Sequence, residues 1–241
     1  MTASSRDRSG DVRVALLYTA AVTVLGAVVN AVTAYTPDTS DALTVWHGLF
    51  WGLLYVPVMV WPFLYRWPLK DIGFGLTPWA LVAAVLMGGV CGGLVGGKPG
   101  FSLLDSSVEA VARVGEELFF RGFLYALLLR MAAGRQRPWI WAVLGSAVVF
   151  MAVHTTAFRP EYVATLGDQP VGWIILDRLL NVLGLALVFG LIRAGTRSIW
   201  PSALAHSLSG GGVGALPAAL AILLAGWLWG KARGERLLEG L

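Results

Sequence analysis

The chain has 241 residues, of which 57% are hydrophobic and only 13% are charged, whereas an ordinary soluble domain has about 25% charged residues. A mean hydropathy of +0.71 is typical of a polytopic membrane protein and excludes a chain of soluble domains. The net charge of +4 is too small to indicate a nucleic-acid partner.

Apolar runs follow one another along the chain. A helix needs roughly 20 apolar residues to cross about 30 Å of hydrocarbon. Six runs reach about this length and two shorter ones follow: 12–35, 42–65, 78–97, 107–131, 138–157, 170–193, 198–212 and 213–230. The glycine-rich sequence SGGGVG at 209–214 separates the last two. We therefore predict an all-α membrane bundle of about eight transmembrane helices.

The ends of the chain differ from its apolar middle. Residues 1–11 are polar, and we expect a disordered N-terminal tail there. The first apolar run is too long for the core of a signal peptide, so we expect a retained anchor. Residues 12–230 are expected to form a single integral-membrane domain, and residues 231–241 a short basic C-terminal tail.

Basic residues alternate between the predicted loops. Thirteen fall on one side: Arg6, Arg8, Arg13, Arg66, Lys70, Arg130, Arg135, Arg137, Arg193, Arg197, Lys231, Arg233 and Arg236. Only Lys98 and Arg159 fall on the other side. The positive-inside rule then places both termini in the cytoplasm, which requires an even number of spans in the cytoplasmic membrane. We interpret these bases as determinants of topology.

The fourth predicted span contains ionisable residues, in VGEELFFRGF at 114–123. Each such group costs roughly 2.5–3.5 kcal/mol on insertion into a membrane. Glu117 and Arg121 are four residues apart and can pair on a helix. Glu116 lies about 100° round the helix from Glu117 and needs another partner. We expect the ion pair to position the helix.

Two histidines lie in other predicted spans, His154 in the fifth and His206 in the seventh. A lone membrane histidine often makes an inter-helix hydrogen bond. A glutamate and two histidines on three neighbouring helices can instead activate water, stabilise an oxyanion or bind a metal. From the residues alone, a hydrolase, a proton-coupled carrier using Glu116 and Asp177, and a structural bundle all remain open.

The polar residues also fall into motifs. EELFFR at 116–121 matches EExxxR, and FMAVH at 150–154 matches FxxxH. The run GLALVFGLIRAGTRSIWPSALAHSL at 184–208 has the character of a segment leading into a third motif. Together these residues resemble the CPBP family of intramembrane proteases, which includes the type II CaaX prenyl endopeptidases and the bacterial Abi proteins. The resemblance covers about 105–210, the expected protease core, with the active site inside the bundle.

The resemblance implies a role for each polar residue. Glu116 would be the general base that activates water, and Arg121 would orient Glu116 and Glu117. His154 would bind the water or a metal, and His206 would lie at the oxyanion. A zinc ion bound by Glu116, His154 and His206 and a metal-free glutamate mechanism both remain open. The implied partners are membrane lipids and a membrane-associated peptide or protein substrate.

One position departs from the family pattern. The third motif usually reads HxxxN, but His206 is followed at that position by Gly210. Ser209, Ser207 or a water beside Gly210 can donate to the oxyanion instead. Loss of such a donor typically costs about 100- to 1000-fold in rate. The departure leaves three alternatives: weak activity, compensation by another group, or a non-catalytic scaffold or bacteriocin-immunity-type protein.

Overall fold

The computed structural model describes residues 5–35, 55, 58–62, 64–65, 67–75, 113–154 and 171–209. These residues form helices and turns, with no strand among them, which confirms the all-α class. The helices are α1 (Ser5–Tyr35), α3 (Leu69–Ile72), η1 (Leu118–Leu124), α6 (Tyr125–Met131), α7 (Pro138–His154), α9 (Val171–Thr196) and α10 (Trp200–Ser209). A helical turn at 113–117 leads directly into η1.

The first helix begins earlier than the sequence predicts. We expected disorder through residue 11, but α1 begins at Ser5, so this expectation is wrong for 5–11. The physical reason is that extending an existing helix by one residue is far easier than nucleating one. The polar residues of 5–11 include no proline to stop that extension.

Two helices in the described part of the chain are long and apolar enough to cross a membrane, judged by length and composition. They contain Val12–Val29 in α1 and Leu179–Thr196 in α9, and α7 is apolar but shorter. The predicted spans 78–97 and 213–230 and the tail 231–241 lie outside the described residues. The count of eight spans and the domain bounds therefore stay predictions.

Apolar side chains on the outside of the described helices suit contact with lipid. On α7, Trp141, Leu144 and Val148 recur at helical spacing and are each about half exposed. On α1, Leu17 and Val24 are more exposed still, at 72% and 62%. Exposed apolar stripes of this kind are unfavourable in water and favourable in hydrocarbon.

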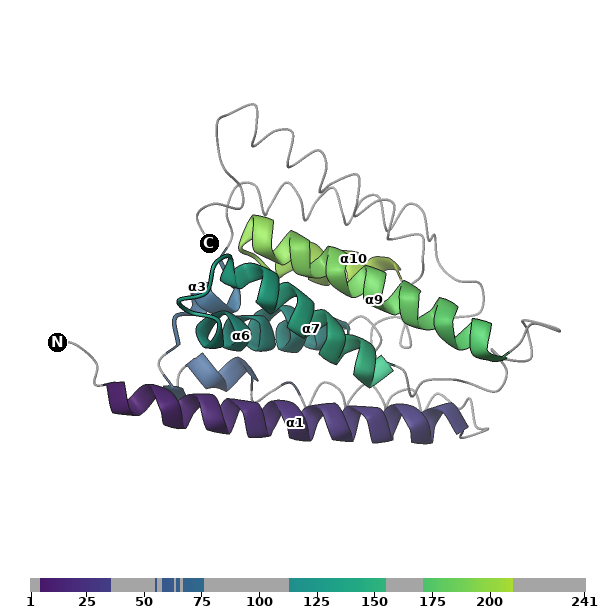
Figure 1. The fold of residues 1–241 in the computed structure, drawn as a ribbon, viewed down its shortest axis with the longest axis horizontal. Coiled ribbons are helices and arrows are strands. Elements are labelled where there is room, and N and C mark those ends of the chain that lie inside the picture. Colours follow the sequence, from purple (N-terminus) through teal and green to yellow (C-terminus); the bar gives the residue numbers. More distant parts are fainter. Residues whose placement is uncertain are drawn as a thin grey trace, which may run out of the picture.

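The helices pack around η1, α6 and α7. In Figure 1, α1 runs along one side, while α9 and α10 lie on the other side of α6 and α7. The most extensive contacts join α7 to α9, and α7 also packs on α6 and α1. This arrangement brings the turn before η1, the end of α7 and the end of α10 together, although they are far apart in sequence.

The helix that carries EELFFR is not a regular α-helix. Residues Leu118–Leu124 form a π-helix, all seven of them buried. Such single-turn π segments are rare and are frequent at functional sites. Gly122 faces the chain at Ile72: a Cβ atom at Gly122 would lie 3.1 Å from Ile72 Cγ2 and 3.2 Å from the Ile72 carbonyl oxygen. The close approach of the two segments therefore requires a glycine.

Gly122→Ala should lower the free energy of unfolding by about 1–3 kcal/mol, because a methyl group overpacks this contact against backbone. Gly172→Ala is the matched control, since a Cβ atom at Gly172 in α9 meets nothing within 4 Å. Thermal unfolding of both variants in detergent measures the difference. Equal midpoints for the two variants would show that the contact at Gly122 is not close.

Candidate active site

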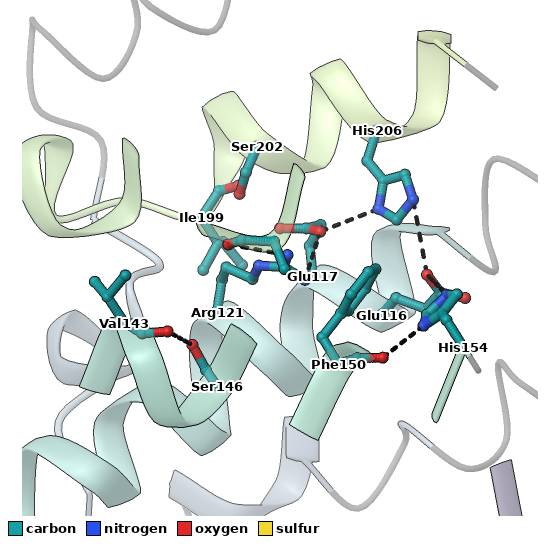
Figure 2. A network of polar contacts seen from close by, with 11 residues as sticks. Glu116, Glu117, Arg121, Val143, Ser146, Phe150, His154, Ile199, Ser202 and His206 are labelled. Carbon is teal, nitrogen blue, oxygen red and sulfur yellow. Dashed lines mark hydrogen bonds and ion pairs between the residues drawn. The ribbon is translucent and has the colours of Figure 1, made fainter. Parts of the chain in front are cut away.

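Five polar side chains come together from three parts of the fold, as Figure 2 shows. Glu116 and Glu117 lie on the helical turn before η1, and Arg121 lies in η1. His154 is the last residue of α7, and His206 lies in α10. All five candidate residues from the motifs EExxxR, FxxxH and the third motif thus meet in one cluster.

Glu117 and Arg121 form the expected ion pair. Arg121 Nη1 lies 3.1 Å from Glu117 Oε1, and both side chains are almost wholly buried. The Arg121 guanidinium lies over the ring of Phe150, 4.3 Å from its centroid, and close to Phe189 and Phe120. Aromatic rings attract a cation at these distances. The pair is therefore enclosed, with little contact with solvent.

Glu117 has a second partner that the sequence does not predict. Its Oε1 atom also lies 3.0 Å from His206 Nδ1. A carboxylate paired with Arg121 can only accept hydrogen bonds, so His206 Nδ1 is the donor. Glu117 therefore does more than position its own helix, because it fixes the tautomer and orientation of His206.

The other histidine is oriented in the same way by a different acceptor. His154 Nδ1 lies 2.9 Å from the Phe150 carbonyl oxygen, and its ring stacks on that of Phe150. A carbonyl oxygen can only accept, so Nδ1 of His154 carries the proton. Both imidazoles thus turn Nε2 towards the interior of the cluster.

Glu116 lies between the two Nε2 atoms. Its Oε2 atom is 3.7 Å from His154 Nε2 and 3.8 Å from His206 Nε2. These distances exceed those of a direct hydrogen bond, and a water molecule beside each pair of atoms could hydrogen-bond to both. The side chain of Glu116 is 14% exposed, whereas that of Glu117 is fully buried. Of the two carboxylates, Glu116 is the one that a small molecule can approach.

The donor set can be compared with a zinc site. Ligands at about 2.0–2.1 Å around tetrahedral zinc lie about 3.3 Å from each other, less than the separations from Glu116 Oε2 to the two histidines. Among the described residues, no group of three or more His, Cys, Asp or Glu side chains is arranged to hold a metal ion. The two histidine Nε2 atoms therefore lie about 0.4 to 0.5 Å further from Glu116 Oε2 than ligands of a bound zinc ion would.

The end of α10 carries the remaining candidates. Ser209 is its last residue, and Gly210 lies outside the described residues, so their role at the oxyanion stays a prediction. Arg113, one turn before Glu117, donates from Nη1 to the Ser207 carbonyl oxygen at 3.5 Å. No local pattern predicts this contact, because the two residues are 94 positions apart.

Arg121→Ala should lower the free energy of unfolding by about 3–5 kcal/mol, because it leaves the buried Glu117 carboxylate without its cation. Arg135→Ala, at an exposed position in the turn before α7, is the matched control. Denaturation of both variants in detergent measures the difference. Similar losses in the two variants would mean that the ion pair contributes little.

Comparison with known families agrees with this geometry. A family model described as type II CAAX prenyl endopeptidase Rce1-like matches residues 106–211, the segment that holds all five clustered side chains. Searches of curated proteins and of solved structures find no match to the chain. The family is a family of membrane-embedded proteases, and the match supports a peptidase. The match bears out the resemblance read from the motifs over residues 106–211 of the 241-residue chain.

Proposed function

We propose that the protein is an intramembrane endopeptidase that hydrolyses a peptide bond of a membrane-associated protein or peptide. The observation that carries this proposal is the position of Glu116 Oε2 opposite the Nε2 atoms of His154 and His206. A carboxylate and two oriented imidazoles around a space for water form a general-base arrangement. The family match over 106–211 supports the same reaction class.

In this proposal Glu116 takes a proton from a water molecule held between its carboxylate and His154 Nε2. The water oxygen adds to the carbonyl carbon of the substrate and forms a tetrahedral intermediate. Glu116 then gives the proton to the amide nitrogen, and the carbon–nitrogen bond breaks. The products are a carboxylic acid and an amine, so the water is fully accounted for.

His206 stabilises the oxyanion of the tetrahedral intermediate. Its Nδ1 proton is held by Glu117, so the ring is stabilised as an imidazolium when Nε2 takes a second proton from solvent before the substrate binds. The imidazolium donates a hydrogen bond from Nε2 to the oxyanion and keeps that proton when the intermediate collapses. This role reduces the need for the side chain that the family pattern expects at Gly210.

The depth of Glu116 in the membrane bears on the class of substrate. Glu116 precedes Arg130 by fourteen residues, which is about 20 Å along a helix axis. Arg130, Arg135 and Arg137 mark the side assigned to the cytoplasm by charge. The site then opens to the lipid or to the opposite side, so we propose a membrane-associated peptide without assuming that it is prenylated.

Gly210 favours one other function, that of a scaffold or bacteriocin-immunity-type protein without catalysis. The two functions differ in their dependence on Glu116, because a scaffold needs the shape of the cluster but not its base. A substitution that removes the charge of Glu116 but keeps the shape of its side chain therefore distinguishes the two functions.

Glu116→Gln should reduce cleavage of a membrane-associated peptide by purified protein at least about 100-fold, because the amide cannot accept the proton. His154→Ala should reduce cleavage strongly as well. Glu235→Gln, in the C-terminal tail, is the matched control and should cleave like the wild type. Full activity in both site variants would refute the assignment.

Metal analysis of the purified protein distinguishes the two mechanisms. The geometry predicts less than one zinc per chain and cleavage that survives a chelator. A stoichiometric metal that is lost in His154→Ala, together with chelator-sensitive cleavage, would establish the metal alternative on Glu116, His154 and His206.

A further inference from the structure

A short segment at 67–75 touches both sides of the active site from outside it. Its Ile72 packs against Gly122 in η1. The Gly73 carbonyl oxygen accepts a hydrogen bond of 3.0 Å from Ile199 N, just before α10 begins, and the Phe74 carbonyl accepts one from Trp200 Nε1. The segment therefore connects the helix of Glu117 and Arg121 with the helix of His206.

Arg193 lies where these parts meet. It belongs to α9, which continues to Thr196, although the sequence placed Arg193 in a loop. Its side chain is 3% exposed. Arg193 Nε donates to the Arg121 carbonyl oxygen at 3.0 Å, and Nη2 donates to the Asp71 carbonyl oxygen at 2.7 Å. A buried cation in this position cannot serve only as a topology signal.

The bond to Arg121 falls inside the π-helix. A guanidinium donor is stronger than a neutral one and holds an acceptor in a fixed place. Tyr125 lies against the same guanidinium, with its ring centroid 5.0 Å away. Arg193 therefore fixes the backbone at the residue whose side chain pairs with Glu117.

Gly73 leaves space for the guanidinium of Arg193 because it has no side chain. Its φ of +90° lies in the left-handed region, which favours glycine. A Cβ atom there would lie 2.7 Å from Arg193 Nε and 2.8 Å from Cζ, so one of the two groups would have to move. A substitution at Gly73 thus displaces Arg193 without removing it.

We propose that Arg193 is a positioning residue for the reaction, and that it acts through two routes. One route runs from the Arg121 carbonyl through the Glu117–Arg121 pair to His206 Nδ1. The other runs from the Asp71 carbonyl through Gly73 to Ile199 and the start of α10. Arg193 touches neither the substrate nor the reacting atoms, and the inference rests on the proposed endopeptidase activity.

The kinetics of four variants test the predicted effect of Arg193 on activity. Arg193→Gln should lower kcat by about 10- to 100-fold and leave KM within about twofold, because small displacements of catalytic groups reduce the rate and not the binding. Arg193→Lys should recover part of the loss. Gly73→Ala should reproduce the loss with Arg193 present, and the double variant Gly73→Ala/Arg193→Gln should be no worse than Arg193→Gln alone.

Arg130→Gln is the matched control. It removes the ion pair with the Asp71 side chain at 2.9 Å but leaves the bond from Arg193 to the Asp71 carbonyl. It should keep kcat within about twofold, even where the unfolding midpoint falls. An equal loss of kcat in Arg130→Gln and Arg193→Gln would reduce Arg193 to general stability and overturn the proposal.

An NMR signal from the Arg121 carbonyl tests the hydrogen bond from Arg193 directly and does not require enzymatic activity. The chain has two Arg–Gly pairs, 121–122 and 233–234. Protein labelled with 13C at the arginine carbonyl and 15N in glycine therefore gives two correlation signals. Arg193→Gln should move the Arg121 signal and leave the Arg233 signal in place.

The outcomes are distinguishable. A wild type that cleaves, with kcat unchanged in Arg193→Gln or with an unmoved Arg121 signal, overturns the inference alone. A wild type that cleaves no membrane peptide overturns the proposed function and with it the catalytic role of Arg193. If Arg193→Gln fails to fold, Arg193→Lys and Gly73→Ala decide the kinetic question.

Discussion

The arrangement of the site depends on one buried oxygen atom, Oε1 of Glu117. It lies 3.1 Å from Arg121 Nη1 and 3.0 Å from His206 Nδ1, so one carboxylate joins η1 to α10. Removing Arg121 leaves the Glu117 charge in a place that cannot be hydrated, which costs several kcal/mol. The shared oxygen therefore ties the stability of the bundle to the orientation of His206.

This sharing separates the roles of two adjacent glutamates. Glu117 is fully buried and is committed to Arg121 and His206, while Glu116 on the next face approaches the Nε2 atoms of both histidines. Aromatic rings around Arg121 exclude water from the structural pair. A low-dielectric surrounding strengthens both the pair and the effect of any proton that Glu116 moves. Glu117 and Arg121 are thus tolerated in an apolar bundle because each has the other as a buried partner.

The sequence predicts those contacts of the site that join residues close together in the chain. The Glu117–Arg121 pair follows from a spacing of four residues, and the difference between Glu116 and Glu117 follows from the angle between their faces. The meeting of His154 and His206 with Glu116 was predicted only through the family motifs, because nothing local relates residues so far apart. The confirmed all-α class follows from apolar runs alone, whereas the number of spans extends beyond the described residues.

Other features could not be predicted, for physical reasons. The bond from Glu117 to His206 joins residues 89 apart and depends on packing of α10. The π-helix at Leu118–Leu124 has no signature in its composition. Arg193 resembled a topology signal because its charge stands at the end of an apolar run. In the structure α9 continues for three more residues, and the Arg193 side chain is buried against the backbone of Arg121 and Asp71. In each case tertiary contacts decide the role of the residue.

Both imidazoles present Nε2 to Glu116 because Nδ1 is held by Glu117 in His206 and by the Phe150 carbonyl in His154. The chain has three histidines, so 15N NMR of histidine-labelled protein, with His47→Gln used to assign the third ring, reads the tautomers directly. We predict a protonated Nδ1 in both His154 and His206. An unprotonated Nδ1 in either ring would contradict this arrangement.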